Sequence, residues 1–281
     1  MKSSWMIVAG FLFSLMGVFV KLGSEYFSSA ELVFYRSIIG LVVIYSIVRI
    51  QGRSLATPHV ASHVWRGLSG FFALMLFFYA ISALPLATAI TLNYTSPLFL
   101  ALLLTFWLKE KPHWRLIGAI VMGFIGVVLL LRPNLHTEQI LAGVMGLASG
   151  FLAGVAYLNV KQLGALGEPD WRVVFYFTLI CTLGAGVWML IHQFHAVTWQ
   201  TLPILLGLGT TATLAQLAMT RAYRVGKTLV VGSLAYTTVI FASLFGMFIF
   251  GEILSLASWL AIALIIASGI VSTFARPRPS L

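Results

Sequence analysis

Long apolar runs separated by short polar connections dominate the chain and predict helices that cross a membrane. Four of these runs, at residues 6–20, 32–48, 116–131 and 259–273, reach or approach the roughly 20 residues that span a hydrocarbon core. The whole pattern predicts ten helices, over residues 4–22, 30–49, 64–82, 86–108, 113–131, 140–160, 171–192, 201–220, 228–250 and 256–275. Two helix starts have a capping signal: Ser28 with Glu31 forms a capping box, and Asp170 is predicted to cap the seventh helix.

The composition agrees with a membrane protein. Of the 281 residues, 60% are apolar and 9% are charged, whereas soluble domains have roughly a quarter of charged residues. The apolar stretch from Ser4 to Val20 is longer than the about 7–15 residues typical of a signal peptide and is interpreted as an uncleaved first helix. We therefore expect an all-α polytopic protein embedded in a lipid bilayer, without a separate soluble domain.

The formal net charge of +10 is best explained by topology, because basic residues concentrate in cytoplasmic loops. If the N-terminus is cytoplasmic, fourteen of the 17 Lys and Arg residues fall on that side: Lys2, Arg49, Arg53, Arg66, Lys109, Lys111, Arg115, Lys161, Arg172, Arg221, Arg224, Lys227, Arg276 and Arg278. This predicts a bacterial inner (plasma) membrane protein with both termini cytoplasmic, a cytoplasmic tail at 276–281, and a periplasmic loop around His192–Gln200. Nucleic acid is not an expected partner.

The chain also contains an internal repeat. A shift of about 140 residues aligns Phe11 with Phe151 and Lys21 with Lys161, and a shift of 142 aligns Tyr94 with Tyr236, Ala80 with Ala222 and Glu110 with Glu252. Residues 1–135 and 140–275 then form two halves of five helices each. Because five is odd, the second half must be inverted in the membrane, as in many secondary transporters.

Particular motifs in both halves resemble a known family. The stretch from Tyr94 through Pro97 to Glu110, and the glycine-rich stretch from Gly118 to Val127, have a second copy around Gly251, Glu252 and Gly269 that lacks the proline. Over its whole length the chain resembles the EamA-type members of the drug/metabolite transporter superfamily. The resemblance implies two inverted five-helix repeats around a central cavity, and export or uptake of a small metabolite, with direction, coupling ion and substrate left open.

A proline inside a helix frees a carbonyl group, and this feature predicts a site in the middle of the membrane. Pro97 lacks an N–H group and therefore predicts a helix kink that frees the carbonyl of Asn93, beside Tyr94. A polar group at this depth needs protein or a water-filled cavity as its neighbour. Asn93 and Tyr94, with the repeat partner Tyr236, are therefore candidates to line the substrate cavity. The alternative for Asn93 is hydrogen bonding between helices.

Two basic residues near the periplasmic end add to the candidate site. Arg36 lies about 9 Å inward from the start of the second helix and is predicted to bind an anionic or zwitterionic group, since ionisable residues inside membranes are usually functional. Lys21 is predicted at the rim, either as a gate or as an interface anchor paired with Glu31 or Glu25.

Further polar residues lie on the cytoplasmic side. Tyr157, Asn159 and Lys161 are predicted as substrate-binding, rim and gating residues, with a topological anchor as the alternative for Lys161, and Gln216 is either a cavity residue or a link between helices. Three residues on the sixth helix, Gly146, Gly150 and Gly154, predict close helix packing. Glu110 and Glu252 are expected to have structural roles at corresponding helix ends.

Several classes of function are disfavoured. The sequence contains no nucleotide-binding motif and no cysteine cluster, and His192 and His195 alone are a weak metal signal, so we expect no cofactor and no metal. Every acidic residue lies at or near a helix end, which disfavours an intramembrane enzyme and a cation/proton antiporter; a membrane scaffold remains a remote alternative.

The resulting hypothesis is a secondary transporter, not an enzyme, that moves a small neutral or zwitterionic metabolite, an amino acid or a related compound, by alternating access. The family resemblance adds an alternative, uptake of a nucleoside-like metabolite such as S-adenosylmethionine. Monomer and homodimer both remain open.

Overall fold

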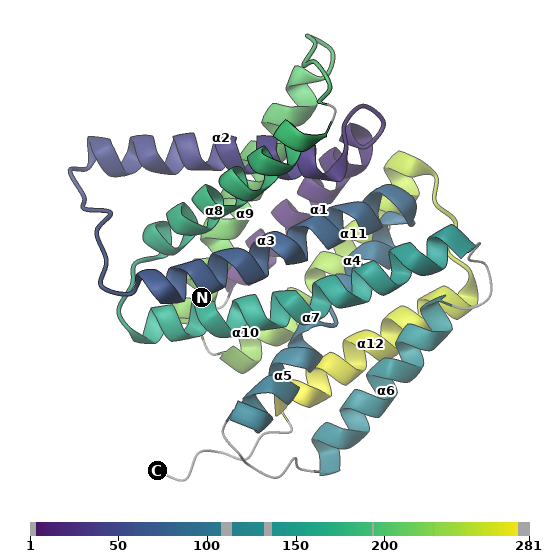
Figure 1. Cartoon of the computed structure of the whole chain (residues 1–281). Helices are drawn as coiled ribbons and strands as arrows, with labels where there is room; N and C mark the ends of the chain where they lie inside the picture. Colours follow the sequence, from purple (N-terminus) through teal and green to yellow (C-terminus); the bar gives the residue numbers. More distant parts are fainter. Residues whose placement is uncertain (1–3, 108–113, 132–136, 193, 227, 275–281) are drawn as a thin grey trace.

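The computed structural model describes the chain except for residues 1–3, 108–113, 132–136, 193, 227 and 275–281 (Figure 1). The described residues form twelve helices: α1 (Trp5–Gly23), α2 (Ser29–Ile50), α3 (Val60–Ala83), α4 (Leu86–Asn93), α5 (Ser96–Trp107), α6 (Trp114–Leu131), α7 (Thr137–Ala165), α8 (Asp170–Ile191), α9 (Leu202–Val225), α10 (Thr228–Ala235), α11 (Thr237–Phe250) and α12 (Leu256–Phe274).

These twelve helices make ten spans, because two of the spans are interrupted. The predicted fourth helix is divided into α4 and α5, and the predicted ninth helix into α10 and α11. Within the described part of the chain, α1, α2, α3, α7, α8 and α9 are each long and apolar enough to cross a membrane by themselves. The prediction of an all-α polytopic fold is confirmed.

Successive spans run in opposite directions, so the bundle has two ends (Figure 1). We call the end where α1 begins the Trp5 side and the end where α1 stops the Gly23 side. On the Trp5 side, the α2–α3 loop contacts the α7–α8 loop, where Thr57 donates a hydrogen bond to Glu168. On the Gly23 side, Glu31 at the start of α2 accepts a 2.6 Å hydrogen bond from the backbone N–H of His195, in the α8–α9 loop.

The helix contacts follow the pattern expected for two halves related by a two-fold axis: the most extensive contacts between helices are repeated between their counterparts. α1 packs on α9, and its counterpart α7 packs on α3, the counterpart of α9. In the same way α1 packs on α11 and α7 on α5, while α2 pairs with its own counterpart α8, and α6 with α12. The boundaries of the halves at 1–135 and 140–275 stay a prediction.

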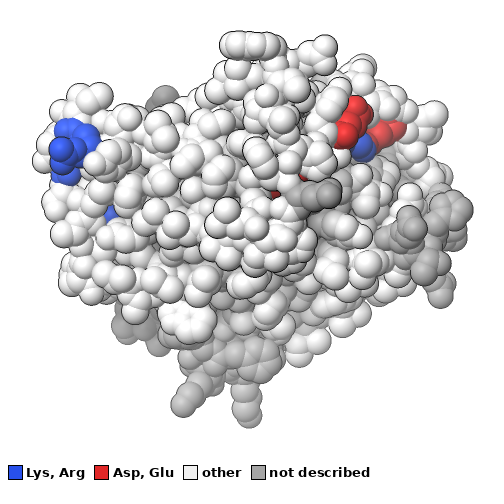
Figure 2. All heavy atoms as spheres, turned by 45° about the horizontal axis from the view of Figure 1, so that its top comes forward, with Lys and Arg blue, Asp and Glu red and all other residues white. Residues whose placement is uncertain are grey.

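The surface of the bundle suits a bilayer. Figure 2 shows a face on which charged side chains gather near the two edges, with an almost uncharged area between them. Tryptophans are exposed at both ends of the spans, as in the interfacial belts of membrane proteins: Trp5, Trp65 and Trp114 on the Trp5 side, and Trp188, Trp199 and Trp259 on the Gly23 side. The predicted bilayer environment therefore has a matching surface.

Of the two predicted helix caps, the structure has one, at the start of α2. The capping box of α2 is confirmed: the Ser28 side chain accepts a hydrogen bond from the Glu31 backbone, and the Glu31 carboxylate accepts one from the Ser28 backbone. The prediction that Asp170 caps α8 is wrong. Pro169 is the residue before the helix, and the Asp170 carboxylate lies 3.3 Å from Arg224 of α9.

Helices α3 and α7 extend further than predicted, and this changes the position of charged residues. α3 begins at Val60 rather than at residue 64, so Arg66 lies about 9 Å along the helix instead of at its end. Arg66 therefore lies inside the span and not in its first turn, where a start at residue 64 would place it. α7 continues to Ala165, so Tyr157, Asn159 and Lys161 all lie within the helix.

Candidate functional site

The two interrupted spans have their breaks at equivalent positions. The first break lies at Tyr94 and Thr95, just before Pro97, whose missing N–H cannot bond the Asn93 carbonyl. The second lies at Tyr236, the repeat partner of Tyr94, although no proline is present there. Broken helices near the middle of a membrane bring backbone polar groups to the site where transporters bind their substrates.

Each break packs against a glycine on the first helix of the other half. A Cβ atom on Gly150 of α7 would lie 2.7 Å from the Leu92 carbonyl oxygen and 3.0 Å from that of Asn93. A Cβ atom on Gly10 of α1 would lie 2.8 Å from the Thr237 hydroxyl, at the second break. Positions 10 and 150 are 140 residues apart. The predicted close packing by Gly150 is thus present, and Gly10 is its counterpart.

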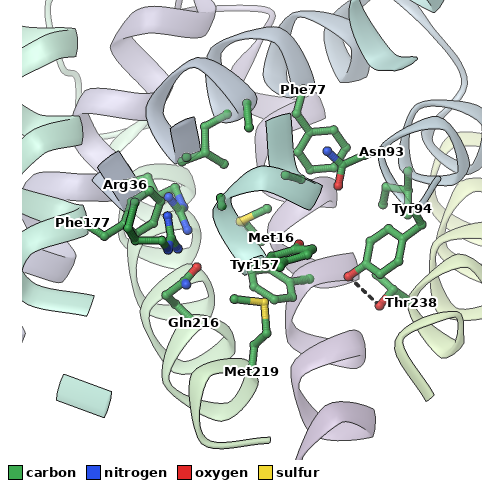
Figure 3. Close-up of a pocket in the computed structure, with 18 residues that line it drawn as sticks. Met16, Arg36, Phe77, Asn93, Tyr94, Tyr157, Phe177, Gln216, Met219 and Thr238 are labelled. Atoms are coloured by element: carbon green, nitrogen blue, oxygen red, sulfur yellow. Dashed lines mark hydrogen bonds between the residues drawn. The ribbon is translucent and has the colours of Figure 1, made fainter. Parts of the chain in front are cut away.

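Next to the first break lies a cavity bounded by both halves (Figure 3). Its empty volume is about 590 Å³, including the part that is open to the outside. Its lining is contributed by eight helices and consists of Phe13, Met16, Arg36, Arg66, Gly70, Ala73, Leu74, Phe77, Ile90, Asn93, Tyr94, Ala153, Ala156, Tyr157, Phe177, Gln216, Met219 and Thr238.

One end of the cavity has amide and hydroxyl groups from the broken span (Figure 3). The Asn93 amide nitrogen donates a 2.9 Å hydrogen bond to Ser149 of α7, and the Thr238 hydroxyl of α11 donates a 2.9 Å bond to the Tyr94 hydroxyl. Asn93 therefore lines the cavity and also links α4 to α7, so both roles considered for this residue are present. Tyr157 lies beside the cavity and stacks on Tyr223, with 5.6 Å between ring centroids.

The other end has two buried arginines. Arg36 from α2 and Arg66 from α3 are only 3% and 2% exposed. Their guanidinium carbons lie 5.5 Å and 4.0 Å from the centroid of the same Phe177 ring. The distance between the two guanidinium carbons therefore cannot exceed the sum of these two distances. At a separation of about 9 Å, two unit charges repel each other by about 2 kcal/mol if the effective dielectric constant is about 20.

Gly70 makes room for this arrangement. A Cβ atom at position 70 would collide with the Arg66 guanidinium, and it would lie 2.7 Å from the Phe177 ring. Arg66 can thus fold back along its own helix and stack on Phe177. A cation over an aromatic face is stabilised, but the ring offers no acceptor oxygen to Nε and Nη1 of Arg66.

Several donors at this end have no acceptor within the described part of the chain. They are Nε and Nη1 of Arg36, Nε and Nη1 of Arg66, and Nε2 of Gln216. No Asp or Glu is among the residues that line the cavity. Each unsatisfied buried donor costs about 1–3 kcal/mol, and more when it is charged. The arrangement is therefore suited to a ligand that brings acceptors and negative charge.

On the Gly23 side, an ion pair connects the two halves. The Lys21 ammonium pairs with the Glu252 carboxylate and also donates a 3.2 Å bond to the Leu84 carbonyl. Glu252 additionally accepts from the backbone N–H of Leu86, at 2.9 and 3.0 Å. This carboxylate follows Gly251, whose φ of 61° allows the chain to reverse after α11. We call these groups the Glu252 link.

The Glu252 link differs from the predicted pairing of Lys21. Glu31 is fully buried and bound to Ser28 and His195, and it is therefore engaged elsewhere. The expected structural role of Glu252 at a helix end agrees with its contacts. Glu110, its repeat counterpart, lies outside the described residues.

Other predicted site residues lie away from the cavity. Tyr236 is buried but packs against Gly269 of α12 and is not part of the lining. Asn159 is partly buried, Lys161 is exposed, and neither belongs to the lining. Arg66 and Thr238 are polar lining residues that were not predicted from the sequence. Arg66 lies within an apolar run, which could have indicated its position, but it was counted among the basic residues of the cytoplasmic side.

A second cluster of charge lies on the Trp5 side, outside the membrane spans. The Glu168 carboxylate accepts hydrogen bonds from Thr57 and from Arg172, the latter at 2.9 Å. Burial opposes ionisation of Glu168, but these hydrogen bonds and the charge of Arg172 outweigh it and hold the pKa below the ordinary value. Within the described part of the chain, no group of three or more His, Cys, Asp or Glu residues could hold a metal ion.

Comparisons with known proteins agree with these features. The model of the EamA-like transporter family matches the chain twice, at residues 2–132 and 140–274. The pseudopaline exporter of Pseudomonas aeruginosa is 30% identical, over 88% of this chain and 87% of its own length. The riboflavin transporter of Vibrio cholerae is 27% identical, over 94% and 90% of the two chains. An S-adenosylmethionine uptake transporter of Rickettsia bellii is 23% identical, over 80% and 76%.

The fold also has a counterpart among solved structures. A crystal structure with 20% sequence identity superposes with a TM-score of 0.68 and covers 98% of each chain. At this level of identity the similarity concerns the fold alone.

Proposed function

Because the chain belongs to the EamA-like transporter family, we propose that it carries an amino acid or a related zwitterionic metabolite across the bacterial inner membrane by alternating access. One observation supports this most directly. The cavity lies between the two halves, beside a broken span, and includes residues of α1, α2, α3 and α4 from one half and of α7, α8, α9 and α11 from the other. A site shared by two inverted halves can be exposed to either side as the halves rock.

The residues that line the cavity indicate which chemical groups the cargo should have. A carboxylate can accept two parallel hydrogen bonds from a guanidinium, and the buried guanidinium groups of Arg36 and Arg66 favour such a group. The amide and hydroxyl groups of Asn93 and Tyr94 can accept or donate at the other end of the cavity. Wholly neutral compounds, the other part of the initial hypothesis, would leave both arginines uncompensated and are less well suited.

Uptake of S-adenosylmethionine is the second candidate, because relatives with that printed name match most of the chain. This compound has the carboxylate and the ammonium of an amino acid, and its sulfonium group adds a second positive charge. No Asp or Glu lines the described cavity, so nothing there compensates the sulfonium, and two guanidinium groups repel it. We therefore place this candidate after amino-acid-like cargo.

The Glu252 link is proposed as a gate on the Gly23 side. Lys21 and Leu86 belong to the first half and Glu252 to the second, so these contacts hold the halves together at one end. With cytoplasmic termini, as the distribution of Lys and Arg predicts, this end is periplasmic. Opening toward the periplasm would then require these contacts to separate.

Flux measurements test the proposed function. The full-length protein in proteoliposomes is expected to give saturable uptake of at least one member of a panel of the twenty amino acids and their N-acetyl and dicarboxylate derivatives. Liposomes without protein provide the background. Saturable flux of S-adenosylmethionine alone would favour the second candidate, and absence of flux for the whole panel would contradict amino-acid-like cargo.

A further inference from the structure

The end of the cavity near Phe177 contains two positive charges and, among the lining residues, no carboxylate. Arg36 and Arg66 are each at least 97% buried, and four of their nitrogens, together with Nε2 of Gln216, have no acceptor in the described part of the chain. Figure 3 shows Arg36, Phe177 and Gln216 together on one side of the cavity, with Asn93 and Tyr94 on the other. One end is thus electrostatically distinct from the other.

From this arrangement we infer that the cargo is a dianion at one end: an amino-acid-derived compound with at least two carboxylate groups, one bound by Arg36 and the other by Arg66. This inference rests on the proposed function and deepens it by naming the class of substrate.

The presence of two buried guanidinium groups favours a cargo with two carboxylates over a cargo with one. A buried charge that loses its partner is strongly destabilising, whereas a paired and hydrogen-bonded charge is tolerated. A cargo with one carboxylate would neutralise one guanidinium and leave the other buried without a counterion. Two carboxylates compensate both, and they also place acceptors at unpaired nitrogens on α2 and α3 and beside Gln216 of α9.

The positions of the two arginines agree with two separate anionic groups. They come from different helices, and their guanidinium carbons lie 5.5 and 4.0 Å from the centroid of the same Phe177 ring. Gly70 leaves the space for Arg66 beside this ring. The remaining lining near the centre is apolar, with Met16, Phe77 and Met219, which suits a hydrocarbon portion between the charged end and the amide end.

Ligand-induced thermal stabilisation of the purified full-length protein tests the inference with matched pairs of probes. L-glutamate is compared with L-glutamine, L-aspartate with L-asparagine, and glutarate with its monoamide, because each pair differs by one carboxylate. Inorganic phosphate is a separate probe for a dianion without carboxylates. We expect the diacids to raise the melting temperature at concentrations about ten- to hundredfold lower than the amides, since one charged hydrogen-bonded contact corresponds to this range.

Variants then assign the effect to the two arginines. Arg36→Gln and Arg66→Gln should each abolish the advantage of the diacid over its amide, because only one guanidinium then remains to pair with a carboxylate. Arg221→Gln is the matched control, because Arg221 is exposed and stacks on Trp5 at a distance from the cavity. Both cavity variants must first show a native elution profile and cooperative melting; a variant that fails is replaced by Arg→Lys at the same position, which keeps the charge and loses the bidentate geometry.

The outcomes separate the inference from the proposed function. Equal stabilisation by diacids and amides, no stabilisation by any diacid, or stabilisation by phosphate alone would overturn the dianion inference. If proteoliposomes nevertheless transport a monocarboxylic amino acid, the proposed function stands and only the substrate class is wrong. A preference for diacids that survives in Arg36→Gln and Arg66→Gln would also overturn the assignment to these residues.

Discussion

Replacing Glu252 by glutamine should weaken the closed state of the Gly23 side. The glutamate accepts from Lys21 and from the Leu86 backbone, and both contacts involve a charged acceptor. Charged hydrogen bonds contribute about 1.5–3 kcal/mol and neutral ones about 0.5–1.5 kcal/mol. The side chains of Lys21 and Glu252 are only 22% and 11% exposed, so screening by solvent reduces these values modestly.

The expected loss for Glu252→Gln is therefore about 2 kcal/mol, because glutamine retains one oxygen for one of the two donors. If the contacts exist only when this side is closed, the same energy shifts the ratio of open to closed states about thirtyfold. The lone cysteine, Cys181, is buried, so Cys181→Ala provides a background for an introduced reporter. Ala73→Cys, in the cavity lining, should then react faster with an impermeant thiol reagent added from the Gly23 side.

The control is Glu25→Gln, which removes a carboxylate from an exposed position near the same end. A cycle of Glu252→Gln, Lys21→Met and the double variant isolates the pairwise energy, which should be about 1–2 kcal/mol. If Glu252→Gln changes neither the melting temperature nor the rate of labelling beyond the change seen with Glu25→Gln, the Glu252 link is not a gate.

Three further predictions concern packing, charge and topology. Gly150→Ala should cost about 1–3 kcal/mol of stability, because the new Cβ would lie 2.5 Å from the Thr95 hydroxyl; Gly164→Ala on the same helix has open space and should melt like the native protein. Glu168→Gln should lower the melting temperature at pH 7, since a lowered carboxyl pKa stabilises the fold above the ordinary value of 4.5, and the difference should shrink as the pH falls below that value toward the lowered pKa. Alkaline phosphatase fused to the C-terminus should be inactive, and strong activity would reverse the predicted orientation.

Features that depend on neighbouring residues were predictable from the sequence. Each span needs about 20 apolar residues, so the ten spans follow from the apolar runs, and the capping box of Ser28 and Glu31 follows from a three-residue spacing. The positions of Arg36 and Asn93 in the lining agree with the initial expectation for the same reason. Both lie well inside an apolar helix, where a polar group needs protein or water beside it.

Features that depend on distant residues were not predictable in this way. The partner of Lys21 is Glu252, 231 residues away, and only the packing of α1, α4 and α11 brings them together. The second break has no proline that could predict it. Gly10, at the repeat position of Gly150, packs against this break, but that contact can be recognised only when the positions of the helices are known. Arg66 was misplaced because helix ends are uncertain by several residues in sequence-based prediction.

The central claim is that the cavity communicates with both sides of the membrane in turn. The direct test labels Ala73→Cys in the Cys181→Ala background with an impermeant thiol reagent, in right-side-out and in inside-out vesicles. Transport by alternating access predicts labelling from each side, at rates that change in opposite directions when a saturating transported compound is present. Labelling from one side only, in all conditions and also with Glu252→Gln, would contradict the account and indicate a receptor or scaffold instead of a transporter.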